Sequence, residues 1–296
     1  MNEFYSDHIR INLTSLAQKV IDNDCIIFGA SSNCNLTYGA FINKIIKNFD
    51  DDFTLNENLL GLYGEKESRI IRLQNDVIDI LDTIDIKGYL KSTYNPSISK
   101  YIKCLLESFV RLPFIEREKL LLKTTIQSIE TAIKSHKNLH ITFKGSLKVV
   151  TPIAIVPAKE GTFQYLVGEE NSVCVSIRLS RIEKIRLVGK SNPIPKNIIS
   201  QINSDLSEFG PTFIAEPKVT IKVKFTQKGA ESYKYSVIHR PIHTDVEPDN
   251  VYIFCCSETQ ALYFFFRFAG DVEILEPQSL RNKMRDLYRY GLEKYL

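Results

Sequence analysis

The stretch LHITFKGSLKVVTPIAIVPAKEGTFQYLVGEENSVCVSIRLSRI, residues 139–182, carries the pattern that decides the fold. Apolar and polar residues alternate within it in short runs, at 139–143, 149–153, 163–168 and 173–179. A period of two is typical of a strand with one buried face. Turns containing Lys-Gly-Ser and Lys-Glu-Gly separate the runs. Short strands joined in this way predict a small, strongly bent sheet or barrel.

The residues before this sheet have a helical pattern, with apolar residues three to four positions apart. Two apolar stripes precede Pro113, and a third helical segment runs from there to Ile133. We expect the stripes to face a core and residues 61–125 to form a helical connector. The first stripe contains Ile70, Leu73, Val77, Ile80, Leu81 and Ile84, and the second contains Tyr101, Leu105, Leu106 and Phe109.

The first sixty residues combine one short strand pattern with two helical patterns. In the run 7–13, apolar residues alternate with His8, Arg10 and Asn12, and a second helical pattern covers 41–49. One strand and two helices cannot bury their apolar faces alone at this size. We therefore expect residues 1–60 to form a homodimer, in which the strands of two copies pair across a two-fold axis.

This order of one strand and two helices, over about residues 5–50, resembles the ribbon-helix-helix family of DNA-binding proteins. The resemblance implies that the exposed strand side chains, here His8, Arg10 and Asn12, read the major groove. Residues 1–60 hold four Lys or Arg against eight Asp or Glu, and this balance disfavours contact with phosphate. Direct contact with nucleic acid and dimerisation alone both stay open for this module.

The segment from Ile129 to Val188 resembles a WYL domain. Gln164 stands where that family often has Trp, and Ser180 stands where it often has Asp. The resemblance implies an Sm-like, SH3-type small β-barrel over residues 126–190, a fold class used for RNA and nucleotide-like ligands. The motifs that carry it are Ala132-Ile133, Leu139–Phe143, Thr151-Pro152, Gln164-Tyr165-Leu166 before Val167-Gly168, and Ile177–Ile182.

Residues 191–296 resemble the C-terminal extension that accompanies WYL domains. The resemblance rests on Phe268-Ala269-Gly270 and Leu275-Glu276-Pro277, and a final helix carries Leu280, Met284, Leu287 and Leu292. The sequence therefore predicts an α+β multidomain protein. Its expected parts are residues 1–60, 61–125, 126–190 and 191–296.

The positive charge of the chain is concentrated in one block. The net charge is only +3, but residues 134–190 hold ten Lys or Arg against four Asp or Glu. Such a block is the usual electrostatic feature of a site that binds a polyanion, although a solvated basic surface has the same composition. The WYL resemblance implies a groove containing Tyr165, Arg178 and Arg181. Neighbouring side chains that could extend the basic surface are His140, Lys144 and Lys148.

The sequence shows no arrangement typical of catalysis. A phosphate-binding glycine loop, a GxSxG motif and an HExxH motif are all absent. His239 and His243 have the spacing of metal ligands, but Pro241 between them prevents a helical face. We expect no enzyme activity, no cofactor and no metal. The six cysteines form no CxxC pair, and no apolar run approaches the ~20 residues that span a bilayer. We expect a cytoplasmic protein with no membrane partner.

The three resemblances together are those of the WYL accessory proteins of type VI-D CRISPR systems. They imply a protein that binds single-stranded RNA and stimulates an RNA-guided CRISPR RNase. An alternative is a dimeric DNA-binding transcriptional regulator, with residues 1–60 on the operator and a WYL domain that senses a nucleotide or nucleic acid. A third possibility is a protein-interaction scaffold. The acidic first module and the basic residues 134–190 favour the predicted barrel as the polyanion site.

Overall fold

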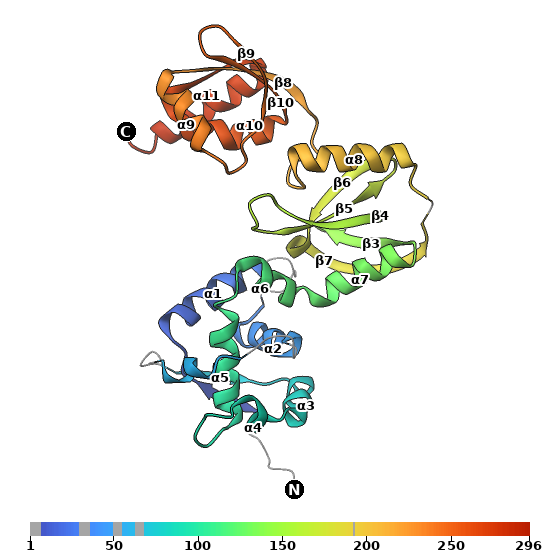
Figure 1. The fold of residues 1–296 in the computed structure, drawn as a ribbon, viewed down its shortest axis with the longest axis vertical. Coiled ribbons are helices and arrows are strands. Elements are labelled where there is room, and N and C mark those ends of the chain that lie inside the picture. Colours follow the sequence, from blue (N-terminus) through green and yellow to red (C-terminus); the bar gives the residue numbers. More distant parts are fainter. Residues whose placement is uncertain (1–6, 30–35, 50–54, 63–67, 192) are drawn as a thin grey trace. The chain divides into compact units, whose positions relative to one another are not determined.

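The computed structural model describes residues 7–29, 36–49, 55–62, 68–191 and 193–296. It has mixed α and β structure with three sheets, which confirms the predicted α+β class (Figure 1). The chain divides into two compact units. The first unit comprises Met1–Ile155, Thr162–Gln164 and Ile177–Ser191, and the second comprises Val156–Gly161, Tyr165–Ser176 and Asn192–Leu296.

The N-terminal half of the first unit is mainly helical. Side-chain caps begin several of its helices, because a hydroxyl or carboxylate oxygen accepts an otherwise unpaired N–H of the first turn. Thr37 accepts from the Ala40 N–H, and Ser97 accepts from the Lys100 N–H. The elements are β1 (His8–Ile11), α1 (Ser15–Gly29), α2 (Tyr38–Asn48), η1 (Glu57–Gly61), β2 (Arg69–Arg72), α3 (Asn75–Thr83), α4 (Ile86–Tyr89), α5 (Ile98–Phe109), α6 (Phe114–Leu121) and α7 (Lys123–Lys134).

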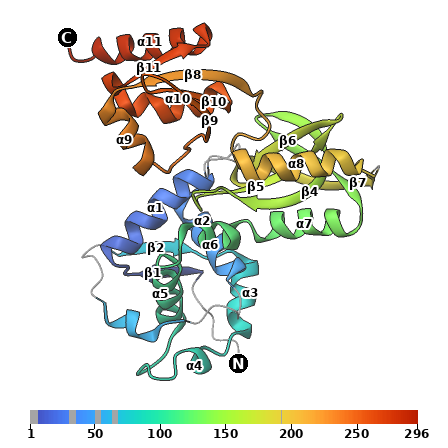
Figure 2. The same ribbon diagram turned by 45° about the horizontal axis from the view of Figure 1, so that its top comes forward.

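The strand β1 has its partner within the same chain. It pairs antiparallel with β2, with Ile9 opposite Ile71, and the two strands lie side by side in Figure 2. The strand β1 therefore needs no second copy of the chain as its partner, and the homodimer stays a prediction. The prediction that Ile70 begins a helical stripe is wrong, since helix α3 begins only at Asn75. Burial alternates along β2 with the period of a strand: Ile71 is 2% exposed and Ile70 is 60% exposed.

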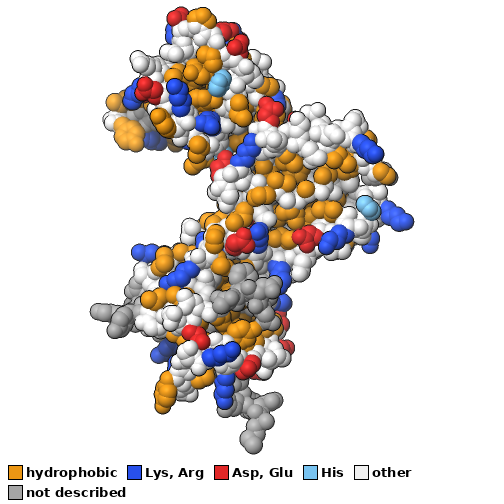
Figure 3. All heavy atoms as spheres, in the orientation of Figure 1, with side chains coloured by type: hydrophobic (Ala, Val, Ile, Leu, Met, Phe, Trp, Pro, Cys, Tyr) orange, Lys and Arg blue, Asp and Glu red, His pale blue; other side chains and the backbone are white. Residues whose placement is uncertain are grey.

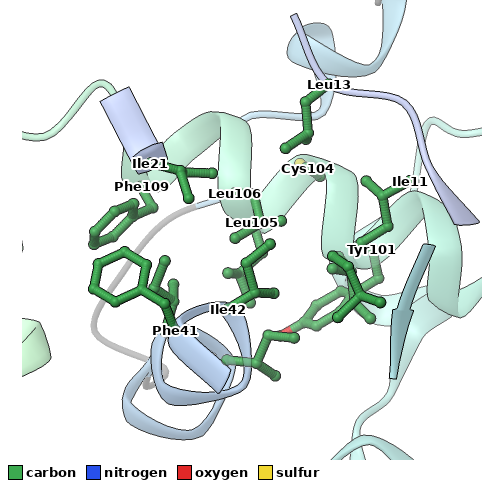
Figure 4. Close-up of a cluster of buried hydrophobic side chains, with 14 of the residues drawn as sticks. Ile11, Leu13, Ile21, Phe41, Ile42, Tyr101, Cys104, Leu105, Leu106 and Phe109 are labelled. Carbon is green, nitrogen blue, oxygen red and sulfur yellow. The ribbon is translucent and has the colours of Figure 1, made fainter. Parts of the chain in front are cut away.

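The order of a strand followed by helices occurs twice in this part of the chain. The first strand is followed by α1 and α2, and the second is followed by α3, the short α4 and then α5. Both sets contribute to a single hydrophobic core, shown in Figure 4. Ile11, Ile21 and Phe41 come from the predicted module 1–60, while Leu105 and Phe109 come from the predicted connector 61–125. The predicted boundary at residue 60 thus falls inside one core.

Two buried acidic side chains fix the helices of this core. Glu107 on α5 is completely buried and accepts both the N–H and the hydroxyl of Thr14, at 2.7 and 3.0 Å. Arg111 donates to the same carboxylate at 2.8 Å. Asp24 on α1 is also completely buried and pairs with Arg117 at 2.6 Å. Each buried charge therefore has a charged partner, without which its burial would be strongly unfavourable.

The predicted strands of the sequence 139–182 are confirmed. They form a five-stranded sheet in the order β6-β5-β4-β3-β7, in which β3 pairs antiparallel with both β4 and β7. Helix α7 packs against β3 and β7. Lys144 and Gly145 have φ of +51° and +70°, as a two-residue hairpin turn between β3 and β4 requires. The strands are β3 (Lys137–Phe143), β4 (Ser146–Pro157), β5 (Gln164–Glu170), β6 (Val173–Arg178) and β7 (Ile182–Lys190), with η2 (Leu179–Arg181) between the last two.

The second unit contains a four-stranded sheet in the order β11-β8-β10-β9. Its core gathers Phe225, Phe254, Phe264 and Phe265. The predicted final helix is confirmed as α11, in which Leu280 and Met284 are buried. No helix in the described part of the chain has the length and apolar character needed to cross a membrane. The elements are α8 (Lys196–Phe209), β8 (Val219–Phe225), α9 (Gln227–Tyr235), β9 (His243–Glu247), β10 (Val251–Cys256), α10 (Glu258–Phe265), η3 (Phe266–Asp271), β11 (Val272–Glu276) and α11 (Gln278–Leu292).

The substitution Glu107→Ala tests the role of this carboxylate in the first core. It leaves the Thr14 N–H without an acceptor and Arg111 without its carboxylate, so we expect the free energy of unfolding to fall by about 3 kcal/mol. Urea denaturation followed by circular dichroism measures the loss. The control is Asp79→Ala on the exposed face of α3, for which we expect a change within about 0.5 kcal/mol. Equal stability of both variants would contradict this account of the core.

Candidate nucleic-acid interface

A groove of about 530 Å³ lies in the first unit beside the turn between β6 and β7. Basic side chains reach it from two places, the β3–β4 turn and the segment Arg178–Arg181. Helix α1 supplies one apolar wall. We call this cavity the arginine groove. Its lining consists of Ile26, Ile27, Lys144, Phe163, Arg178, Ser180, Arg181 and Glu183.

Arg178 is held in a defined position in the groove. Its guanidinium carbon lies 3.2 Å from the centre of the Phe163 ring, a close cation–π contact. Its Nε donates to the hydroxyl of Ser180 at 2.6 Å, and Ser180 is itself buried. A hydroxyl accepts this hydrogen bond without neutralising the positive charge, as a carboxylate at the same position would. Ser180 therefore orients Arg178.

Two further aromatic rings pack in series behind Phe163, on α6 and α1. The Phe163 ring meets the Phe114 ring edge-on, with centroids 5.0 Å apart, and Phe114 stacks on Phe28 at 5.5 Å. Phe114 begins α6 and Phe28 lies near the end of α1. The aromatic base of the groove is thus continuous with the helical part of the first unit, and this rigid support limits the movement of Arg178.

Arg181 and Lys144 present their charges at the surface. Both residues are exposed, and within the described residues neither makes an ion pair. The one acidic residue of the lining, Glu183, accepts the N–H of Gly145 at 3.0 Å and so fixes the turn that carries Lys144. Three cations and one carboxylate give the groove a net positive lining, and Arg suits phosphate because its planar fork makes two charge-assisted hydrogen bonds.

A buried acidic side chain, Glu118, interacts electrostatically with Arg178 of the groove. Glu118 on α6 has no exposed surface, and its Oε2 accepts the backbone N–H of Gln164 at 2.7 Å. Burial raises the pKa of Glu118 to about 7, although this hydrogen bond and the positive charge of Arg178 act in the opposite direction. Near neutral pH the carboxyl is therefore partly protonated.

The structure brings together three of the predicted binding residues. Arg178, Arg181 and Lys144 line one groove, whereas Tyr165, Lys148 and His140 do not line it. Tyr165 belongs to the second unit. Sequence reasoning missed Phe163, which precedes β5 and forms the base of the groove. The alternation over 163–168 is a signal for Phe163, because it places Phe163 and Tyr165 on the same face of the predicted strand.

The register of β3 separates His140 from Lys148. His140 lies opposite Val149 and Arg186, whereas Lys148 lies opposite Ile141, and residues directly opposite one another share a face of the sheet. His140 and Lys148 therefore point to different faces and cannot extend the same basic surface. The face of His140 instead carries Arg186 and Lys184, both exposed and neither predicted as a binding residue.

The β1–β2 ribbon forms a second basic surface in the first unit. His8 and Arg10 are exposed on β1, Asn12 is exposed just after it, and Arg72 lies opposite His8 on β2. Asp7 binds His8 at 2.7 Å and Arg72 at 3.0 Å, so part of this positive charge is neutralised. The hydrogen bond from His8 and the charge of Arg72 lower the pKa of Asp7.

No protein-family model and no curated protein matches the sequence. Among solved structures, the fold is similar to that of a CRISPR Cas-related protein, with a TM-score of 0.83 and 20% sequence identity over 99% of this chain and 95% of the other. At this identity the likeness establishes the fold. Proteasome accessory factor B/C of Arthrobacter aurescens matches with a TM-score of only 0.33 and 17% identity, over 79% of this chain and 39% of the other.

The raised pKa of Glu118 predicts a pH dependence of stability. The pKa of Glu118 is about 7 in the folded protein, above its ordinary value of 4.5, so binding of this proton stabilises the folded state. This contribution to the free energy of unfolding is fully present below about pH 4.5 and is lost as the pH rises through 7. Glu118→Gln removes this titration. We expect its stability relative to the wild type to improve by up to about 3 kcal/mol between pH 4.5 and 8. Urea denaturation at both pH values measures the change, and Glu130→Gln on the exposed side of α7 is the control. Parallel pH profiles of wild type and Glu118→Gln would refute the prediction.

Proposed function

We propose that this chain is a CRISPR-associated accessory protein that binds single-stranded RNA through the arginine groove. The observation that carries the proposal is the convergence of Arg178, Arg181 and Lys144 on one cavity with an aromatic base. The fold shared with a CRISPR Cas-related protein supports the CRISPR association. The resemblance of residues 126–190 to WYL domains, which implies an Sm-like barrel, supports RNA as the ligand. In this proposal the protein has no enzyme activity of its own and stimulates an RNA-guided RNase.

The composition of the part of the sheet that belongs to the first unit favours a polyanion over a small anion. The segments 137–155 and 177–191 carry eight Lys or Arg and one Asp or Glu. Such an excess favours a ligand with many phosphates, because each phosphate that is bound releases counterions. A single strand also suits the chemistry of Arg178, since one face of its guanidinium rests on Phe163 and guanidinium planes can stack on unpaired bases. Proteins read RNA sequence mostly through such unpaired bases.

The double variant Arg181→Ala, Lys144→Ala tests the groove. Both side chains are exposed, so the fold is expected to persist, and affinity for single-stranded RNA should fall at every sequence. The slope of log K against log salt should become shallower by about 0.7 for each phosphate that the variant no longer neutralises. Fluorescence anisotropy over a series of salt concentrations measures both quantities. Lys224→Ala, an exposed lysine on β8, is the matched control and should change neither. Wild-type affinity and slope in the double variant would overturn the proposal.

A DNA-binding regulator is the second candidate function, and the β1–β2 ribbon is the observation that favours it. The ribbon exposes His8, Arg10 and Arg72 together, and a two-stranded ribbon fits the major groove of duplex DNA. In this interpretation the second strand of the ribbon comes from β2 of the same chain. Binding of DNA by the ribbon would then require no homodimer.

The double variant Arg10→Ala, Arg72→Ala separates the two functions. We expect it to keep its affinity for single-stranded RNA, because Asp7 already neutralises part of the ribbon and the arginine groove is unchanged. Titrations with single-stranded RNA and with duplex DNA of the same sequence make the comparison. A tenfold or larger reduction of RNA affinity would move the RNA site to the ribbon, and a reduction confined to duplex DNA would establish the second function.

A further inference from the structure

A second cavity in the first unit shares no residue with the arginine groove. Its volume is about 460 Å³, within the range of pockets that hold small molecules. It lies beside α6 and α7, where these helices face Ile155 of β4 and Gln164 of β5. In Figure 3 apolar side chains gather over the five-stranded sheet in this part of the molecule. We call this cavity the amide pocket, after the side chains described next.

The lining combines apolar walls with carboxamide side chains. Leu120, Ile126 and Ile155 provide the apolar surface. Asn48, Gln127 and Gln164 provide the carboxamides. Few convergent polar groups on an apolar lining are the usual composition of a site for a small organic ligand.

Gln164 is the feature that points to a ligand. It is only 6% exposed, and its Nε2 has no hydrogen-bond partner among the described residues. Its backbone is fixed, because the Gln164 N–H donates to the buried Glu118 carboxylate, whose Oε1 likewise has no partner within the described chain. Buried polar atoms in folded proteins are nearly always hydrogen-bonded. A buried amide of this kind at the wall of a cavity is explained if its partner is a ligand.

The charges at the rim are balanced. Glu116 and Lys119 form an ion pair at 2.8 Å, and Lys123 and Glu130 lie further along the same rim. Two acidic and two basic side chains leave no excess of positive charge that would attract a chain of phosphates. A ligand of this cavity must therefore obtain its affinity from apolar contacts and from hydrogen bonds with the carboxamides.

We propose that the amide pocket binds a nucleobase, with its faces against the aliphatic walls and its polar edge against the carboxamides of Gln164, Gln127 and Asn48. Asn and Gln side chains pair with the donor and acceptor atoms of base edges through two hydrogen bonds. The base comes either from a free nucleoside or from an unpaired position of an RNA strand. This site stands independently of the arginine groove, because no residue is shared.

The variant Gln164→Leu separates a binding role from a structural one. It removes the amide and keeps a side chain of similar size, so the fold should be at least as stable as the wild type, since a buried polar atom without a partner is removed. Isothermal titration of the full chain with adenosine, guanosine, cytidine and uridine provides the measurement. We expect at least one nucleoside to bind the wild type and its affinity to fall at least tenfold in Gln164→Leu. Arg181→Ala, in the arginine groove, is the control and should bind the nucleoside normally.

The source of the base is decided by RNA titrations of the same variants. If the base belongs to an RNA strand, Gln164→Leu lowers RNA affinity without changing the salt slope, whereas Arg181→Ala reduces the slope. If the ligand is a free nucleoside, RNA affinity is unchanged in Gln164→Leu. Nucleoside and RNA binding that are both unaffected by Gln164→Leu would overturn the amide pocket. A salt slope in Arg181→Ala equal to that of the wild type would overturn the arginine groove alone.

Discussion

The hydrogen bond from the Gln164 N–H to the buried Glu118 carboxylate is the contact on which the functional part of the first unit depends. It joins α6 to the first residue of β5 at 2.7 Å. The two residues at this point serve different cavities. Phe163 forms the base of the arginine groove, and Gln164 lines the amide pocket. Successive residues of an extended chain point in opposite directions, so one carboxylate fixes the orientation of both. A shift of the chain by one residue at this point would turn the side chain of Gln164 toward the arginine groove and that of Phe163 toward the amide pocket.

Much of the strand structure could be predicted from the sequence, and the reason is local. Alternation over five to seven residues depends only on which side of a strand is buried, and the runs around Leu139 and Val173 therefore identified β3 and β6. The grouping of Arg178 with Arg181 was also predictable from local sequence, because the two residues are only three positions apart and a short turn keeps them close. Lys148 could not be assigned correctly, since the face of a residue relative to its neighbours depends on register, and register is set by pairing between strands.

The pairing of β1 with β2 could not be predicted, because it joins segments about sixty residues apart. The pattern of the first strand was correct, and its need for a partner was also correct. A strand of four residues has too little sequence to reveal where its partner lies. Ile70 also fits the spacing of the helix that follows, so the sequence analysis assigned it to a helical stripe and not to a second strand. Phe163 could not be predicted as part of the site, because the WYL resemblance implies a groove that contains Tyr165 and not Phe163.

The two strands of the ribbon differ in sequence, HIRI in β1 and RIIR in β2. In a symmetric homodimer both strands would be copies, and any ligand that both strands contact equally would have to repeat across the two-fold axis. A ribbon built from one chain has no such restriction. Substitutions in β1 and in β2 can accumulate separately, so each half of the surface can become adapted to a different part of its ligand. A molecule without internal symmetry can therefore fit the whole ribbon in a single orientation, which gives the bound complex a direction.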